Sequence, residues 1–340
     1  MCKFHDEFNS RVVVAGNMQV VVLAGGIGSR LKPWTNDIPK PLLPMLDITL
    51  LERVVEGFPS DLVDEVVVAG GYKIEMIEDY FRTADADFDV RIVPEDRPLG
   101  TGGALGNCRD IVSGRFACFN GDIVSSLDVG PMLEQHSKMG VKGTLALWEV
   151  EDPTRFGIVG IDENRNVTQF KEKPKPEEVF SNLINAGSYI LEEEVFDIMP
   201  DERHSLERDV FPVLAEERSL AGFPFEGYFI DAGTPVSWHD GVKRCIEENR
   251  FKTGSISQGS WHEGKTTTAR NSMIQDNCIV DGDVIDSTLL RGARIEQGAS
   301  VSNCLIGEGA IIGKNAKLSG VVVGHRTNVP AGHIQSEGTF

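Results

Sequence analysis

The chain has 340 residues, of which 41% are hydrophobic and 25% are charged, and its formal net charge at pH 7 is −19. This length predicts two domains, and no apolar run reaches the roughly 20 residues that would span a bilayer. So acidic a surface excludes binding to nucleic acid or to an anionic membrane. The six cysteines are scattered without a CxxC pair, which is typical of reduced thiols in a cytoplasmic protein.

The first 250 residues alternate between short apolar runs and amphipathic stretches. We expect residues 1–17 to form an N-terminal arm or to precede a native start at Met18. Strands are predicted at 19–24, 65–69, 88–93, 115–119 and 143–150, and helices at 49–58, 73–82, 102–111, 129–139, 205–217 and 235–249. The alternation predicts an α/β domain over 18–250, with a Rossmann-like, mostly parallel sheet and helices on both faces. Residues 156–191 are predicted to be strands inserted over the open end of that sheet.

The C-terminal tail shows a different spacing of apolar residues. Apolar residues recur there every five or six positions, and identical residues recur 17 positions apart, as in Gly292 with Gly309 and Ile295 with Ile312. A helix or a single strand lacks this period, which predicts a solenoid with three faces per coil over 265–340. The repeat resembles the hexapeptide pattern of the left-handed parallel β-helix. Residues 251–264, rich in Gly and Ser, are predicted to be a linker, and an exposed solenoid edge favours a homo-oligomer formed through this domain.

The most informative segment is 23–42, which reads LAGGIGSRLKPWTNDIPKPL. An apolar strand leads into a glycine-rich turn, whose bare backbone lets N–H groups approach an anion closely. Arg30 can grip phosphate oxygens with two parallel hydrogen bonds, and Lys40 is held in an extended stretch between two prolines. The segment therefore predicts a phosphate-binding turn. It lacks the Gly-Lys-Ser/Thr of a Walker loop and the third glycine of a dinucleotide fingerprint.

Two aspartates follow apolar runs in the same domain. Asp122 ends Asn-Gly-Asp after the predicted strand 115–119, and Asp231 opens Asp-Ala-Gly-Thr-Pro. The carboxyl end of a strand is where open α/β sheets bind ligands, and two carboxylates with substrate phosphates suit Mg²⁺. The alternative is that each aspartate only caps the turn that follows. Because the chain is so acidic, a phosphate site must be made positive locally, by a few cations and a divalent metal.

The 23–42 string closely resembles the signature of the sugar-1-phosphate nucleotidyltransferases, the nucleoside-diphosphate-sugar pyrophosphorylases. Further strings resemble the family's motifs in the same order: RFGIV at 155–159, FKEKP at 170–174, NAG at 185–187 and GYFIDAGTP at 227–235, where Phe229 and Ala232 replace the family's Trp and Ile. The segment PLGTGGAL at 98–105 lacks the glutamine that thymidylyl- and uridylyltransferases usually place there. It is more similar to the segment of mannose-1-phosphate guanylyltransferases, which favours guanine.

The resemblance implies transfer of a nucleotidyl group from a nucleoside triphosphate to a sugar 1-phosphate, with GTP and mannose 1-phosphate giving GDP-mannose. It implies that Arg30, Lys40 and Lys173 are catalytic and that Asp122 and Asp231 hold Mg²⁺. The nucleotide contacts that it implies are Leu23, Ala24, Gly25, Gly26, Gly28, Pro98, Gly100, Thr101, Gly102 and Asn120. The sugar-phosphate contacts that it implies are Gly157, Glu172, Lys173 and Asn185.

Three alternatives stay open at this point. The same chemistry can use UTP or dTTP with glucose 1-phosphate. A non-catalytic regulatory subunit can keep the fold, although such subunits tend to lose the arginine, lysine or aspartates that this chain retains. The tail can carry an acyltransferase, with His262, His325 or His333 as its base. Lone histidines in a solenoid are usually solvated, so we favour a packing and assembly role for the tail.

Overall fold

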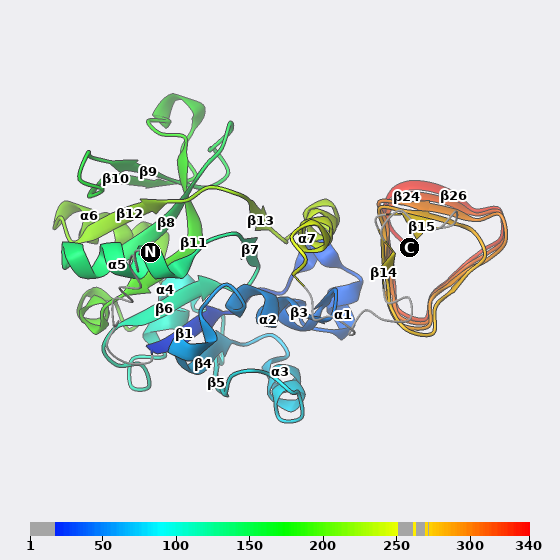
Figure 1. Ribbon diagram of the computed structural model, residues 1–340, viewed down its shortest axis with the longest axis horizontal. Helices are drawn as coiled ribbons and strands as arrows, with labels where there is room; N and C mark the ends of the chain where they lie inside the picture. Colours follow the sequence, from blue (N-terminus) through cyan, green and yellow to red (C-terminus); the bar gives the residue numbers. More distant parts are fainter. Residues whose placement is uncertain (1–17, 251–260, 263–268, 271) are drawn as a thin grey trace, which may run out of the picture.

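The structure is a computed structural model that describes residues 18–250, 261–262, 269–270 and 272–340. The predicted arm 1–17 and nearly all of the predicted linker 251–264 lie outside these residues. Figure 1 shows an α/β body on one side and a triangular coil of strands on the other, with helix α7 (Pro235–Glu247) on the side of the α/β body that faces the coil.

One mixed sheet runs through the α/β body. Its first half consists of four parallel strands in the order β5-β4-β1-β6, with the bounds Val90–Pro94, Val63–Gly70, Met18–Leu23 and Phe116–Asn120. Its second half adds β11 (Leu183–Leu191), β8 (Gly143–Glu149), β12 (Leu220–Pro224), β9 (Gly157–Ile161) and β10 (Val167–Glu172). The Rossmann-like parallel arrangement that the sequence predicts is confirmed in the first half.

The prediction that 156–191 lies over the open end of the sheet is wrong, because β9, β10 and β11 all belong to the sheet. β11 pairs antiparallel with β6, with Ser188 opposite Phe119, and pairs with β8 as well. This strand is therefore part of the sheet and does not lie over its open end. Ile190 and Leu191 are fully buried and pack into apolar clusters on opposite faces of the sheet. Burial of both faces of β11 favours a central position over a peripheral one.

Helices cover both faces of the sheet, as predicted. Along β1, Val20 and Val22 pack into one apolar cluster, and Val21 packs into another. The first cluster contains side chains of α2 (Leu50–Val55), α3 (Ile74–Phe81) and α5 (Val129–Met139), and the second contains those of α4 (Gly100–Gly106) and α6 (Phe211–Glu216). Among the described residues, no helix is long and apolar enough to cross a membrane.

Short elements join the longer ones. Short helical segments lie at Ser29–Leu31, Lys40–Leu42, Ser60–Leu62, Pro176–Glu178, Glu193–Ile198 and Leu206–Val210, together with α1 (Trp34–Asp37). Two small antiparallel pairs are β2–β3 (Pro44–Met45, Ile48–Thr49) and β7–β13 (Ile123–Ser125, Phe229–Asp231). Helix α2 begins at a capping box, because Thr49 N–H donates to Glu52 Oε2 at 2.8 Å and Glu52 N–H donates to Thr49 Oγ1 at 3.3 Å.

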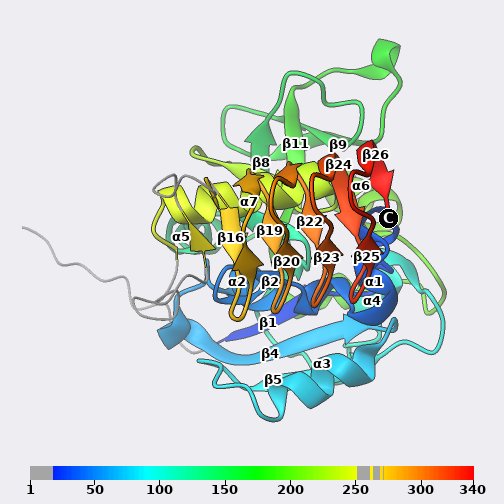
Figure 2. The same cartoon turned by 90° about the vertical axis from the view of Figure 1, so that its right-hand side faces the viewer.

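The tail forms the left-handed β-helix that its repeat predicts (Figure 2). Its strands are β14 (Trp261–His262), β15 (Ala269–Arg270), β16 (Ser272–Ile274), β17 (Ile279–Val280), β18 (Asp283–Ile285), β19 (Thr288–Leu289), β20 (Arg294–Ile295), β21 (Ser300–Ser302), β22 (Leu305–Ile306), β23 (Ile311–Ile312), β24 (Lys317–Val323), β25 (Asn328–Val329) and β26 (Ile334–Thr339). Ile295 pairs with Ile312, 17 positions on. The first coil is shorter, because Ile279 pairs with Arg294.

The β-helix packs directly against the α/β body. Trp34 of α1 is fully buried, and its Nε1–H donates to the carbonyl oxygen of Val323 at 2.9 Å. The Trp34 ring stacks on His325 with 6.1 Å between ring centroids, and Lys243 of α7 forms an ion pair with Asp286 at 2.9 Å. The apolar cluster that contains Trp34 also contains Met273, Leu290, Leu305 and Val322 from the β-helix. The two parts of the molecule therefore share this apolar cluster, while the interior of the β-helix forms a cluster of its own.

Candidate active site

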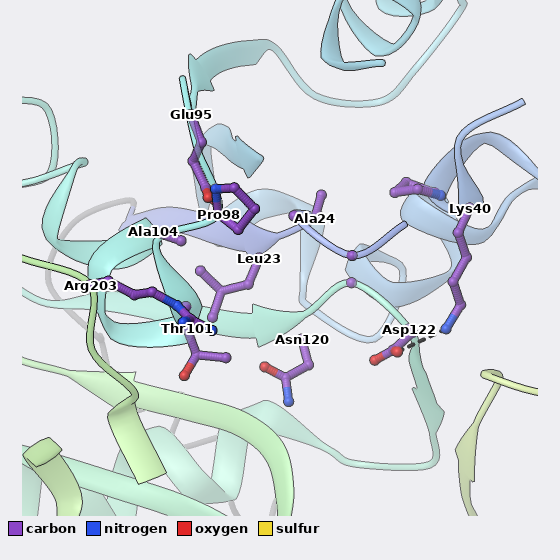
Figure 3. Close-up of a pocket in the computed structure, with 15 residues that line it drawn as sticks. Leu23, Ala24, Lys40, Glu95, Pro98, Thr101, Ala104, Asn120, Asp122 and Arg203 are labelled. Atoms are coloured by element: carbon purple, nitrogen blue, oxygen red, sulfur yellow. Dashed lines mark hydrogen bonds and ion pairs between the residues drawn. The ribbon is translucent and has the colours of Figure 1, made fainter. Parts of the chain in front are cut away.

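A pocket of about 360 Å³ opens where β1 and β6 end. It is lined by Leu23, Ala24, Gly25, Gly26, Lys40, Pro41, Glu95, Pro98, Gly100, Thr101, Ala104, Asn120, Gly121, Asp122 and Arg203. Figure 3 shows Lys40 and Asp122 at one end of the pocket and Glu95, Pro98 and Arg203 toward the other. The carboxyl ends of parallel strands are the place where open α/β sheets bind ligands.

At the first end, Lys40 Nζ lies 2.8 Å from Asp122 Oδ2. The Lys40 side chain is only 9% exposed, so its ammonium is held in place by the protein rather than by water. Gly121 permits this arrangement, because a Cβ there would lie 2.9 Å from the carbonyl oxygen of Leu23, which accepts the Gly121 N–H at 3.0 Å. The backbone just before Asp122 is therefore in direct contact with the backbone at Leu23, where the glycine turn begins.

Asp231 and Arg30 complete a cluster of charges beside this pair. The β7–β13 ladder places Asp231 opposite Ile123, and Ala232 N–H donates to the Asp122 carbonyl at 2.9 Å. Burial and the negative charge of Asp122 raise the pKa of Asp231, while Lys40 and Arg30 act to lower it. A Cβ on Gly233 would collide with Arg30 Nη2 and would lie 2.7 Å from Asp231 Oδ1, so both groups pack against this glycine.

The pair of aspartates fits a divalent cation. Asp231 Oδ1 is buried and has no hydrogen-bond partner in the described part of the chain. The negative charge of Asp122 disfavours the charged form of Asp231, and a cation between the two carboxylates would relieve this effect. No group of three or more His, Cys, Asp or Glu side chains that could hold a metal ion occurs among the described residues. A metal on these two carboxylates therefore needs oxygen ligands from substrate and water, which is the usual environment of Mg²⁺.

At the other end of the pocket, the start of α4 is joined to a segment a hundred residues away. Thr101 Oγ1 donates to Glu207 Oε2 at 2.6 Å and accepts the Leu206 N–H at 3.0 Å. The carbonyl oxygen of His204 accepts the Gly102 N–H at 3.1 Å. The segment around His204 therefore holds the turn that forms this side of the pocket.

The residues expected to bind the sugar phosphate form a neighbouring cluster. A Cβ on Gly157 would lie 2.9 Å from Glu172 Oε2, and a Cβ on Gly187 would lie 2.6 Å from Asn120 Nδ2. Asn185 Nδ2 donates to the Tyr189 hydroxyl at 2.9 Å. Burial, and then the charge of Glu207, raise the pKa of Glu172. Asn120, which lines the pocket and packs against Gly187, connects this cluster with the pocket.

Eight sequence-predicted residues do not line the pocket. Arg30 and Asp231 lie in the charge cluster beside it, and Gly157, Glu172 and Asn185 lie in the neighbouring cluster. The other three are Lys173, Gly102 and Gly28. Lys173 follows β10 with its side chain 61% exposed, and its Nζ lies 3.5 Å from Glu172 Oε1. Gly102 is buried behind the pocket, with its N–H directed to His204. Gly28 has a positive φ of 67° at the turn after Gly26, where a Cβ would come within 2.9 Å of Thr35 and 3.2 Å of Lys40. The structure brings most of the other predicted residues to the pocket, to its Asp231–Arg30 extension or to the Glu172 cluster.

The prediction missed Glu95, Arg203 and Glu207. Glu95 and Arg203 line the pocket, and Glu207 holds Thr101. None of the three belongs to a string that resembles a family motif. Glu95 alone had a signal, since it follows the predicted strand 88–93 by two residues, where a ligand-facing side chain is expected.

The fold and the site define a nucleotide-handling enzyme, with a glycine turn, clustered cations and paired carboxylates at the end of a parallel sheet. The family model described as "Nucleotidyl transferase" matches residues 19–248, and the chain belongs to this family. A second model, described as "GlmU-like, C-terminal hexapeptide", matches residues 259–335.

The relatives of this chain share most of its length. It is 29% identical over 320 residues to mannose-1-phosphate guanylyltransferase 1 of Arabidopsis thaliana, a match that covers 92% of this chain and 87% of the relative. It is 30% identical over 328 residues to the mannose-1-phosphate guanylyltransferase catalytic subunit beta of Danio rerio, with 90% of each chain covered. HddC from Yersinia pseudotuberculosis, solved in complex with GMP-PN, is 29% identical with a TM-score of 0.55, and the match covers 67% of this chain and 99% of HddC.

Proposed function

We propose that this protein transfers a guanylyl group from GTP to mannose 1-phosphate, releasing pyrophosphate and forming GDP-mannose. The observation that carries the proposal is the cluster of Lys40, Arg30, Asp122 and Asp231 beside the glycine turn. The choice of substrates is supported by the names of the relatives that match about nine tenths of the chain, and by the guanine nucleotide analogue in HddC.

In the proposed reaction, a phosphate oxygen of the sugar phosphate attacks the α-phosphorus of GTP. A new P–O bond forms, and the bond to the β-phosphate oxygen breaks as pyrophosphate leaves. Because the attacking oxygen is already anionic, the reaction needs no general base, and catalysis consists of positioning and charge neutralisation. Arg30 and Lys40 neutralise charge on the α-phosphate and pyrophosphate, and Lys173 neutralises the sugar phosphate.

Asp122 and Asp231 are the residues that would hold Mg²⁺. The metal, when bound, neutralises phosphate charge and brings the two anionic substrates together. The protein supplies the two carboxylates and keeps Lys40 within 2.8 Å of one of them. Displacement of Asp122 by phosphate oxygens would leave Lys40 free to turn toward the nucleotide.

The sugar-phosphate side of the proposal rests on Glu172, Asn185 and Gly157. Glu172 is only partly exposed and accepts hydrogen bonds, which suits sugar hydroxyl groups. Gly157 brings its backbone close to Glu172, where a side chain would not fit. The exposed Lys173 next to them can reach a phosphate without losing a strong partner, because its 3.5 Å contact with Glu172 is long.

The decisive experiment incubates the purified protein and Mg²⁺ with each of the four nucleoside triphosphates and a panel of sugar 1-phosphates, and measures pyrophosphate. We expect the fastest release with GTP and mannose 1-phosphate. Fastest release with UTP or dTTP and glucose 1-phosphate would establish the pyrimidine alternative instead. Nucleotide binding without pyrophosphate release from any pair would point to a regulatory subunit.

For the tail, we propose packing and self-association rather than acyl transfer. His325 Nδ1 already accepts the Glu308 N–H at 3.0 Å, and His333 Nε2 is hydrogen-bonded to Gln335 at 3.1 Å, while the side chain of His262 lies outside the described residues. The last strand, β26, pairs with β24 alone among the described strands, which leaves an edge for a second copy. The free thiols of the described cysteines support the cytoplasm as the proposed compartment.

A further inference from the structure

A second pocket of about 360 Å³ lies at the opposite end of the sheet from the active site. The active-site pocket opens where β1 and β6 end, whereas this one opens where β4 and β5 begin, beside α2. We call it the α2 groove, and no part of the proposed reaction uses it. Its apolar lining includes Ile48, Val55, Phe58, Val63, Ala86 and Phe88.

The floor of the α2 groove is a part of the apolar core that reaches the surface. Val55 and Phe58 are buried in the cluster on the α2 side of the sheet, and the half-buried Val63 and Phe88 pack against that cluster. The rings of Phe88 and Phe81 lie 6.0 Å apart between centroids, which fixes one wall. Apolar surface in a concave site is unfavourable in water, so an occupant with apolar side chains gains free energy by covering it.

The rim of the α2 groove is acidic. Its lining includes the carboxylates of Glu52, Glu56, Asp85 and Asp87, and it includes no lysine or arginine. Glu56 is already paired with Arg250 at 2.8 Å, whereas Asp85 is exposed on the segment before β5. A rim of this sign favours an occupant that carries a cation beside its apolar side chains.

The chain itself supplies such an occupant beside the groove. β1 begins at Met18, which pairs with Val63 of the groove lining. Met18 is buried in the same apolar cluster as Val55 and Phe58. Because neighbouring strands lie about 5 Å apart, the segment 1–17 is attached to the fold within about one strand spacing of the α2 groove.

The sequence just before Met18 matches the groove in polarity. Residues 8–17 read FNSRVVVAGN, in which Arg11 precedes three consecutive valines, Val12 to Val14. Five extended residues span roughly 15–18 Å, so a tether from Met18 lets Val13 reach the groove. The valines suit the apolar floor, and the arginine suits the acidic rim.

We propose that the α2 groove binds residues 8–17 of the same chain, with the valine side chains on the apolar floor and the Arg11 guanidinium beside Asp85. The covalent tether keeps the segment at a high effective concentration near the groove, which favours this occupant over a separate molecule. The assignment concerns the stability of the α/β domain and does not depend on the proposed reaction.

Disulfide trapping in the full chain tests where the segment lies. Val13→Cys is combined with Ala86→Cys, in a Cys2→Ser background that removes the other thiol of the segment. The control combines Val13→Cys with Ser113→Cys, because Ser113 is exposed and its N–H donates to Gln19 Oε1, close to the start of β1 but outside the groove lining. Under mild oxidation, we expect the Ala86 pair to form an intramolecular disulfide about tenfold faster than the control pair.

A single substitution in the segment tests whether the contact covers apolar surface. In Val13→Asp, we expect the thermal midpoint to fall by about 2–4 °C and the fluorescence of the neutral apolar dye Nile red to rise. Asn9→Asp is the matched control, because it adds the same charge without removing a valine, and we expect it to change neither value. Both changes precede β1 and leave every described residue unaltered, so neither removes a contact of the core.

Three outcomes would overturn the assignment. Equal trapping at positions 86 and 113 would show that the segment does not dock in the groove. A disulfide-linked dimer of the Ala86 pair would show that the groove binds the segment of a second copy. Equal dye binding and equal thermal midpoints in the unmodified protein and Val13→Asp would show that the groove is open and accessible to a separate partner.

Discussion

Single residues set the electrostatics of the site. Lys40 and Asp122 are paired at 2.8 Å in a mostly buried position, and Arg30 lies with Asp231 against Gly233. Each cation lies beside a carboxylate, and the Lys40 ammonium tolerates its burial because Asp122 pairs with it. In the proposed reaction, phosphate oxygens would pair with the two cations, and Mg²⁺ would be held by the two carboxylates.

The first prediction concerns Arg30. Replacing it in Arg30→Ala removes a cation that is present for the transition state, so kcat should fall by about 10²–10³ with the thermal midpoint nearly unchanged. Steady-state pyrophosphate release measures this effect. Lys32→Ala is the control, because Lys32 is also an exposed cation but, unlike Arg30, is not among the charges that act on Asp231. Arg30→Ala turnover within a few-fold of the unmodified protein would remove Arg30 from the reaction.

A second residue-scale prediction concerns pH and His136. This side chain is fully buried, with Nδ1 2.8 Å from Thr144 Oγ1 and Nε2 3.1 Å from Glu192 Oε1. Burial lowers the pKa of His136 below its ordinary value of 6.5, although the hydrogen bond to Glu192 opposes the shift. As the pH falls through about 6.5, His136 is therefore protonated in the unfolded chain but stays neutral in the folded protein. The neutral His136 side chain contributes fully to the stability of the fold above pH 6.5, and this contribution is lost as the pH falls below 6.5.

We accordingly expect His136→Gln to flatten the dependence of unfolding free energy on pH between 7 and 5. The difference from the unmodified protein changes by at most about 1.4 kcal/mol per pH unit, the limit for one proton. Urea unfolding at a series of pH values measures it. A difference that stays constant over this range would show that His136 does not titrate differently in the two states.

At the scale of elements, α4 contains glycines that allow the segment around His204 to pack closely against it. Residues 100–106 contain four glycines, which is unfavourable for an isolated helix. A Cβ on Gly102 would collide with the imidazole of His204, whereas one on Gly106 would lie 3.8 Å from it, at ordinary contact distance. Glycine at position 102 therefore lowers the helix propensity of α4, but it makes room for His204, whose segment holds this side of the pocket.

This difference predicts opposite outcomes for the same substitution. Gly102→Ala forces α4 away from His204, so both the unfolding free energy and the affinity for the nucleotide should decrease, the latter as a raised KM. Gly106→Ala should be neutral or stabilise by about 0.5–1 kcal/mol, since alanine is the better helix former. Urea unfolding and nucleotide titration of the two variants measure the contrast. Equal effects of the two changes would show that contact with His204 does not hold the helix.

At the scale of the whole molecule, the signature segment is also the docking surface for the β-helix. Trp34 lies between Arg30 and Lys40 in the chain and donates to Val323 in the β-helix. The next residue, Thr35, donates through Oγ1 to the Gly28 carbonyl at 2.9 Å. A chain of contacts therefore runs from the tail through Trp34 and Thr35 to the glycine turn. The tail stabilises the segment that presents both cations.

The final prediction is that the two domains unfold together. In the unmodified protein, calorimetry should show one cooperative transition, because the apolar cluster around Trp34 includes side chains of both domains. Trp34→Ala removes a large buried ring and should cost about 3–5 kcal/mol, which separates the transition into two. Trp34→Phe retains most of the packing and serves as the milder control. A single transition in Trp34→Ala would mean that the domains are coupled elsewhere.

The sequence by itself determined the features that repeat or lie close together along the chain. Alternating apolar runs predicted the strands and helices of the α/β domain, because burial imposes its period locally. The 17-residue repeat predicted the β-helix, because each coil buries equivalent residues. The glycine turn, Arg30 and Lys40 were recognisable within twenty residues, and the comparisons confirm the family that they indicate.

Only the tertiary structure decided which distant residues meet. The place of β11 inside the sheet, the contact of Thr101 with Glu207 and the hydrogen bond from Trp34 to Val323 join residues far apart in the chain. The place of Glu95 in the pocket lining became apparent only when the fold laid its side chain beside Gly25. Local patterns report which side chains are buried, but not what they are buried against, because that depends on strand order and on the packing of one domain against the other.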